Sequence, residues 1–227
     1  MKATRILLTA TAVLFTGSAF GGTVTIVQDL FGAGTSGSTG GWQAVTWTQT
    51  GSYTNVSIGA NLAINNGNST GTGIAYLVTA LGPSATLANL VATDPIMVTG
   101  NPGVNTMTSL FTGLSLGPGT YYLLINPTDV GLFDSLVWDG AGTPTQTLDT
   151  GVTQQADRVL SGTVATPPYD SANMATSASV DHIFSVTGTA VAVTGTPEPG
   201  TIGMMALGLG GLGVFLRRKR VALLNRQ

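Results

Sequence analysis

Apolar residues alternate with small or polar ones between residues 56 and 64. One set of alternate positions holds Val56, Ile58, Ala60, Leu62 and Ile64. Because successive side chains of a β-strand point to opposite faces, this alternation predicts a strand with one buried face. Asn65-Asn66-Gly67 follows and predicts a turn. No long segment before Thr201 has a helical period, so the pattern predicts an all-β fold for this part of the chain.

Further segments rich in Val, Ile, Thr, Tyr and Trp are separated by Gly, Asn, Pro and Ser, and they predict more strands. They cover residues 23–31, 42–49, 74–81, 107–116, 120–126, 132–138 and 180–186. Strands at this spacing are typical of a β-sandwich or a jelly roll. Pro118-Gly119 predicts the turn of a hairpin, after which Tyr121, Leu123 and Ile125 share one face. Residues 141–179 are polar and contain prolines, which indicates a long irregular loop with room for short edge strands.

The N-terminus has the three parts of a secretory signal peptide. Lys2 and Arg5 precede an apolar run over residues 6–15, and Gly17 and Ala19 follow as small residues. We expect export by Sec-type machinery and cleavage after Ala19, so that the signal peptide covers residues 1–19. An uncleaved anchor is the alternative, although the apolar run is short for a membrane span. The β-sandwich, here called the ectodomain, is then expected over residues 20–187, and a linker over residues 188–196.

The C-terminus has a second apolar run, over residues 201–216, that carries no charge. As a helix it would reach roughly 24 Å, which is enough for a short transmembrane helix. A basic cluster follows, formed by Arg217, Arg218, Lys219 and Arg220. By the positive-inside rule this cluster stays in the cytoplasm, together with a tail over residues 221–227, and the ectodomain lies across the membrane.

Pro197-Glu198-Pro199 stands directly before this helix. The box, the helix and the basic cluster together resemble the PEP-CTERM sorting domain of exported proteins of Gram-negative bacteria, over residues 196–220. The resemblance implies an inner-membrane-anchored precursor, which an exosortase cuts near the box. It also implies a mature form at the cell surface or outside the cell, often linked to exopolysaccharide. A plain C-terminal anchor is the alternative. The expected hairpin, with its Leu116-Gly117-Pro118-Gly119-Thr120-Tyr121, resembles one common in secreted bacterial β-sandwich domains.

The charges of the ectodomain exclude some partners. Seven of the eight basic residues lie in the two terminal segments, and Arg158 alone lies in the ectodomain, against nine aspartates. Nucleic acid is therefore not an expected partner. Asp129, Asp134 and Asp139 could help to hold Ca²⁺, but they lack the spacing of a calcium loop, so we predict no metal or other cofactor. The chain has no cysteine, which excludes zinc-thiolate, iron–sulfur and cysteine-nucleophile chemistry.

Three short motifs have a catalytic form without the context that catalysis needs. The glycine-rich run 32–37 matches G-x-G-x-x-G, but no helix or βαβ unit follows, so we expect a flexible loop. Residues 113–117 match G-x-S-x-G around Ser115, with His182 downstream, but no α/β alternation surrounds them. Asp181-His182 lies in an expected strand, where a hydrogen-bonded core histidine is the better interpretation than a metal ligand.

Trp138 beside Asp139 is the best candidate for a glycan contact, because an aromatic ring can stack on a sugar while a carboxylate orients its hydroxyls. We therefore expect a non-catalytic structural or interaction protein, exported to the cell surface or to the extracellular matrix. A carbohydrate-binding module of the exopolysaccharide matrix is the first alternative. A secreted serine hydrolase using Ser115 is a distant second.

Overall fold

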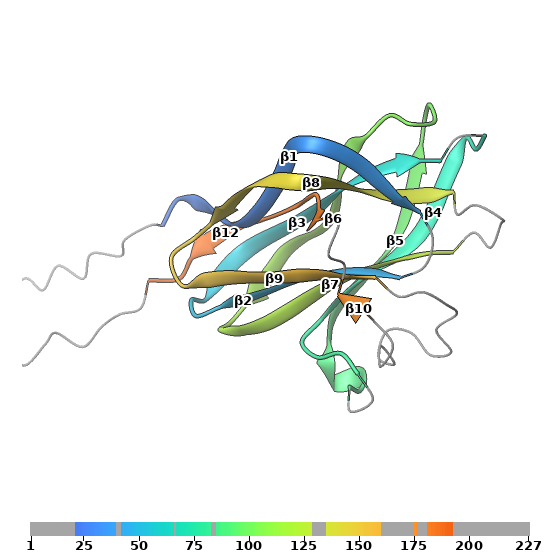
Figure 1. The fold of residues 1–227 in the computed structure, drawn as a ribbon. Helices are drawn as coiled ribbons and strands as arrows, with labels where there is room; N and C mark the ends of the chain where they lie inside the picture. The colour runs from blue at the N-terminus through green and yellow to red at the C-terminus, as the bar shows by residue number, and fades with distance from the viewer. Residues whose placement is uncertain are drawn as a thin grey trace, which may run out of the picture. The chain divides into compact units, whose positions relative to one another are not determined.

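The computed structural model describes residues 21–39, 42–65, 67–82, 85–128, 135–159, 175–176 and 181–192. The expected signal peptide (1–19) and the expected sorting segment (197–220) lie outside these ranges. The described strands all belong to one compact unit, which ends at Val191. Within this unit, two six-stranded antiparallel sheets face each other (Figure 1). The prediction of an all-β sandwich is therefore confirmed.

The first sheet has the strand order β11-β8-β1-β12-β3-β6, and β8 also pairs with β3. Its strands are β1 (Thr23–Thr39), β3 (Tyr53–Ile64), β6 (Thr106–Leu116), β8 (Leu136–Leu148), β11 (Asp181–His182) and β12 (Phe184–Ala190). The first and last long strands of the ectodomain, β1 and β12, are thus neighbours in the interior of this sheet.

The second sheet has the strand order β10-β9-β2-β7-β4-β5. Its strands are β2 (Gln43–Gln49), β4 (Thr70–Val78), β5 (Leu90–Thr99), β7 (Gly119–Pro127), β9 (Val152–Val159) and β10 (Ala175–Thr176). A 3₁₀ turn, η1 (Leu87–Asn89), precedes β5. Strand β3 belongs to the first sheet and β4 to the second, so the turn after Ile64 carries the chain between the two sheets.

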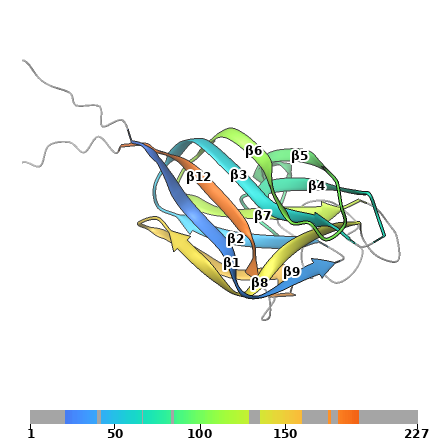
Figure 2. The ribbon, with the colours of Figure 1, turned by 90° about the horizontal axis from the view of Figure 1, so that it is seen from above.

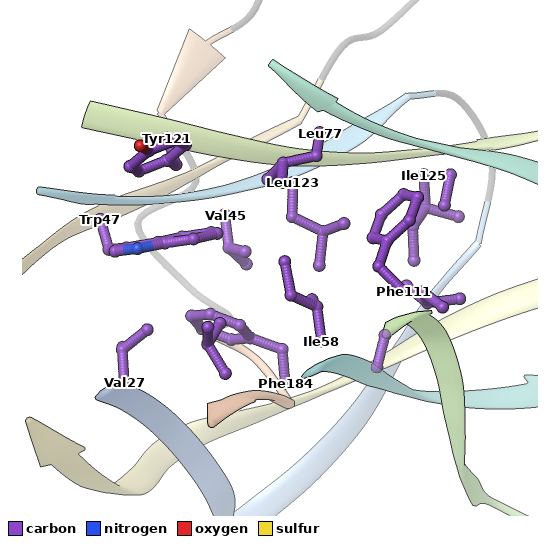
Figure 3. Close-up of a cluster of buried hydrophobic side chains, with 14 of the residues drawn as sticks. Val27, Val45, Trp47, Ile58, Leu77, Phe111, Tyr121, Leu123, Ile125 and Phe184 are labelled. Carbon is purple, nitrogen blue, oxygen red and sulfur yellow. The ribbon is translucent and has the colours of Figure 1, made fainter. Parts of the chain in front are cut away.

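The core fills the space between the sheets with the apolar faces of the strands (Figure 3). The alternation that the sequence has in residues 56–64 is present here, since Val56, Ile58, Ala60 and Leu62 all belong to this core. Trp47 of the second sheet stacks on Tyr121 at a ring distance of 5.7 Å, and it meets Phe184 of the first sheet at 6.1 Å. Aromatic contacts therefore join the two sheets.

The glycine-rich run 32–37 is not a loop, contrary to expectation. Strand β1 continues through it to Thr39, and its backbone pairs with β8 from Ala33 opposite Thr143 to Thr39 opposite Val137. The register shifts between Leu30 and Ala33, where a β-bulge admits the first glycine. Glycine lowers strand propensity, but here the backbone hydrogen bonds to a long neighbouring strand outweigh that preference.

The expected long loop over residues 141–179 is also wrong in its first part. Strand β8 extends to Leu148, and β9 follows after a short turn. The segment looked irregular because its outward-facing side chains are polar and Pro144 interrupts it. Two backbone ladders hold it nevertheless, since β8 pairs with β1 and β9 pairs with β2. Neither partner can be recognised from the local composition.

The hairpin expected at Pro118-Gly119 also differs in the structure. The Pro118-Gly119 turn does not form a hairpin within one sheet, because β6 lies in the first sheet and β7 in the second. It is a corner between the sheets, although Tyr121, Leu123 and Ile125 do share the buried face as predicted.

Strand β5 has no counterpart among the strands that the sequence predicts. It contains Asp94-Pro95, and proline is compatible with it because, among the described strands, β5 is an edge strand that pairs with β4 alone.

The two ends of the ectodomain lie side by side. Thr23 pairs with Thr189, and the amide of Val191 donates to the carbonyl of Ser52 at 2.8 Å. Figure 2 shows the start of β1 next to the end of β12. Strand β12 continues to Ala190, so regular structure runs three residues into the range 188–196 that the sequence indicates as a linker.

Candidate functional site

The residues expected to direct sorting lie outside the described part of the chain. They are Pro197, Glu198 and Pro199 of the box, and Arg217, Arg218, Lys219 and Arg220 of the basic cluster. The expected transmembrane helix 201–216 lies there too. Among the residues that are described, no helix is both long enough and apolar enough to cross a bilayer.

Trp138 does not offer a platform for a sugar, contrary to expectation. It lies on the inner face of β8, is only 1 % exposed, and packs within the core. Its Nε1 donates to the carbonyl of Ile183 at 3.0 Å, so the polar edge of the ring is also used inside the protein. Trp42 and Trp47 are buried as well. None of the three tryptophans therefore has a ring face open to a ligand.

His182 is a buried, hydrogen-bonded histidine, as predicted. Its Nδ1 lies 2.8 Å from Oδ2 of Asp157, and its backbone amide donates to the same oxygen. Both side chains are fully buried. His182 belongs to β11 of the first sheet and Asp157 to β9 of the second, so the pair connects the sheets. The His182 ring also packs on Trp138 at a ring distance of 4.7 Å.

A second carboxylate connects the sheets along the same strand β9. Asp29 of β1 accepts hydrogen bonds from the side-chain amides of Gln154 on β9 and of Gln146 on β8, the latter at 3.4 Å. Gln146 also donates to Gln154 at 2.9 Å. Burial raises the pKa of Asp29 to about 6, the two amide hydrogen bonds oppose that rise, and the nearby carboxylates of Asp157 and Asp181 add to it.

Asp139, the expected partner of Trp138, is buried on β8. Burial raises its pKa to about 6, while the nearby His182 lowers it in part. Within the described ranges, no hydrogen-bond partner reaches Oδ2 of Asp139, Oδ1 of Asp157 or Nε2 of His182. No group of three or more potential ligands among the described residues is arranged to hold a metal ion. Asp129 and Asp134, named with Asp139 for Ca²⁺, lie outside the described residues.

The residues of the hydrolase alternative lie on two different strands of the first sheet. Ser115 is exposed on β6, an edge strand of the first sheet that pairs with β3, whereas His182 is fully buried on β11, which pairs with β8. A serine nucleophile needs its base within hydrogen-bond distance. His182 instead contacts the carboxylate of Asp157 in the opposite sheet, and that contact joins β11 to β9.

Sequence reasoning did not identify the polar contacts along β9. One signal was present, because Asp29 follows Val27 by two residues in an expected strand and period two puts both side chains on the same face. An aspartate on the face of a buried valine indicates an interior carboxylate that needs donors. Its donors, Gln146 and Gln154, lie in the segment that was expected to be irregular, so the contact could not be inferred.

One comparison with known proteins concerns the C-terminus. Residues 196–220 match the family model of the PEP-CTERM protein-sorting motif. The chain therefore carries this sorting motif near its C-terminus. The matched residues coincide with the segment in which the sequence indicates box, helix and basic cluster. The motif identifies an exported protein with a C-terminal sorting signal, and it implies processing by an exosortase. No curated protein and no solved structure matches this chain.

Proposed function

We propose that this protein is a non-catalytic structural or interaction protein of the cell surface or extracellular matrix of a Gram-negative bacterium. Its precursor is anchored in the inner membrane by the helix 201–216, with the basic cluster in the cytoplasm. An exosortase cuts near Pro197-Glu198-Pro199 and frees the β-sandwich. The observation that carries this proposal is the sorting motif at residues 196–220.

The interior of the sandwich supports a structural role. Two pairs of buried polar side chains link the two sheets, His182 with Asp157 and Asp29 with Gln154. The carbohydrate-binding alternative has no comparable observation in its favour, because Trp42, Trp47 and Trp138 are all buried. The acidic ectodomain still suits a matrix rich in divalent cations, which can bridge carboxylates of protein and polysaccharide.

The proposed processing is tested by the intact mass and the cell fraction of the mature protein from its native host. Wild type is compared with Glu198→Ala and with a matched control, Thr194→Ala, which alters a residue just ahead of the motif. We expect wild type and control to end near Pro197-Glu198-Pro199 and to leave the inner membrane, and Glu198→Ala to retain residues 217–227. Retention of residues 217–227 in all three proteins would show a plain anchor and contradict the proposal.

A further inference from the structure

The last described residues of the ectodomain, 181–191, occupy the interior of the first sheet, and we call them the closing segment. Its strand β12 lies between β1 and β3 and pairs with both of them. Its strand β11 pairs with β8. Between these strands, the amide of Ile183 donates to the carbonyl of Asp139 at 2.8 Å, and its carbonyl accepts from the amide of Asn61 at 3.0 Å. The closing segment therefore joins three strands that come earlier in the chain.

The side chains of the closing segment extend these links to the second sheet. Phe184 and Val186 are fully buried in the core, and Phe184 meets Trp47 of β2. His182 holds Asp157 of β9. Trp138 of β8 donates its indole N–H to the carbonyl of Ile183. Removal of the segment would open the core between the sheets and leave these buried polar groups without their partners.

The closing segment crosses the membrane after the strands with which it pairs, because it comes later in the chain. Strand β1 leaves the membrane first, but it cannot gain its neighbour β12 until the end of the ectodomain has crossed. Without β12, the facing edges of β1 and β3 are unpaired, and both carry apolar side chains that belong to the core. A sheet with its interior strand missing exposes unpaired backbone and apolar surface, so it is not a stable intermediate.

We propose that the ectodomain stays unfolded during export until the closing segment has crossed the membrane, and that this segment then completes the sandwich. This inference rests on the proposed export and sorting of the chain. Only residues 192–195 separate the closing segment from the sorting motif, which starts at Thr196. Four residues span at most about 14 Å. Folding is thereby delayed until the sorting motif itself reaches the membrane, and the chain remains extended, as an export channel requires, up to that point.

The timing is tested on the protein during its own synthesis and export. Translation of the full coding sequence is arrested at increasing lengths, and protease is added on the far side of the membrane. We expect every intermediate whose closing segment is still inside the channel to be digested, and resistance to begin once residue 191 has emerged. Resistance of an intermediate that lacks the closing segment on the far side would overturn the proposal.

A matched pair of substitutions in the full-length chain tests the segment itself. Val186 points into the core, whereas Thr187, the next residue of β12, lies on the opposite face and is partly exposed. We expect Val186→Asn to speed digestion of the exported ectodomain at least about tenfold, because cleavage follows the population of open molecules. Thr187→Asn should remain close to wild type. Equal resistance of both variants would overturn the proposal.

The variant Glu198→Ala separates the test of the closing segment from the test of the proposed function. Glu198→Ala lies outside the closing segment, so its ectodomain should become protease-resistant as wild type does, whatever the mass of its C-terminus. A Glu198→Ala protein that is cut normally would contradict the proposed sorting and leave the folding result valid. A Glu198→Ala protein whose exported ectodomain stays protease-sensitive would instead overturn the closing role of residues 181–191, since that segment is intact in it.

Discussion

At the scale of single residues, the unusual feature is the pair of buried aspartates that connect the two sheets. Asp29 and Asp157 both contact partners across the interior, Gln154 and His182 respectively. A buried carboxylate is unfavourable unless donors surround it, and these donors come from strands far apart in sequence. The contacts therefore make the pairing of the sheets specific along β9.

The raised pKa values of Asp29 and Asp139 predict how stability depends on pH. Both values rise from 3.8 to about 6 on folding, so the native state holds these protons more tightly than the unfolded state. The stabilisation that these two carboxyls contribute should be complete below about pH 4 and should be lost as the pH rises through about 6. Each carboxyl contributes roughly 1–3 kcal/mol to this loss. Urea unfolding at a series of pH values measures the effect.

Asp29→Asn is the variant that isolates one of these groups. An amide cannot ionise, and rotation of the Gln146 or Gln154 amide can restore a hydrogen bond to it. We expect a smaller loss of stability between pH 4 and 6 than in wild type, and a still smaller one when Asp139→Asn is added. If the pH dependence of the double variant equalled that of wild type, these two carboxyls would not be its source.

Trp138→Ala distinguishes a core role from a glycan contact. The ring is buried among core residues and its N–H is bonded, so truncation leaves a cavity and frees the carbonyl of Ile183. We expect a loss of about 3–5 kcal/mol in the free energy of unfolding. Chemical denaturation measures it, with Thr187→Ala as a partly exposed control. A variant with unchanged stability but lost binding on a glycan array would restore the carbohydrate-binding alternative.

At the scale of elements, strand β4 shows how closely the sheets approach. Its sequence Thr70-Gly71-Thr72-Gly73 has glycine at alternate positions, and both glycines face Leu136 of β8 in the opposite sheet. A Cβ atom on Gly73 would lie 2.7 Å from Cδ2 of Leu136 and 2.9 Å from the carbonyl oxygen of Asn126. The absence of a side chain at Gly73 thus lets β4 and β8 pack at this point.

Gly73→Ala is therefore expected to destabilise the sandwich by about 1–3 kcal/mol through overpacking. Gly117→Ala is the matched control, because a Cβ atom there meets nothing within 4 Å and its backbone is not left-handed. Thermal unfolding of the two variants beside wild type provides the comparison. An equal melting temperature for both variants would mean that β8 moves aside without cost.

At the scale of the whole ectodomain, the chain begins and ends on neighbouring strands. Thr23 of β1 lies opposite Thr189 of β12, so these two strands pair although they are far apart in the sequence. Contacts of this kind slow folding, since the chain must close a long loop before it gains them. The same geometry also brings the two termini of the sandwich together.

A circular permutant tests this adjacency. Residue 192 is joined to residue 21 by a short glycine–serine linker, and new ends are placed in the exposed loop at residues 101–103, between β5 and β6. The permutant should keep the fold and fold faster than the parent, because β12 and β1 become a local hairpin. Circular dichroism and stopped-flow refolding measure both properties. A permutant without cooperative unfolding would contradict the pairing of β1 with β12.

The sequence by itself determined the all-β class, most strand positions and the sorting signal. Those features are local, because a period of two in apolar residues and a box followed by an apolar run and basic residues need no distant partner. Tertiary structure alone decided which strands pair, that glycine-rich β1 and polar β8 and β9 are regular, and that Trp138 is buried. It also brought Asp29 to Gln154 and Asp157 to His182. These outcomes depend on backbone hydrogen bonds and side-chain contacts between distant strands, which no local pattern of residues encodes.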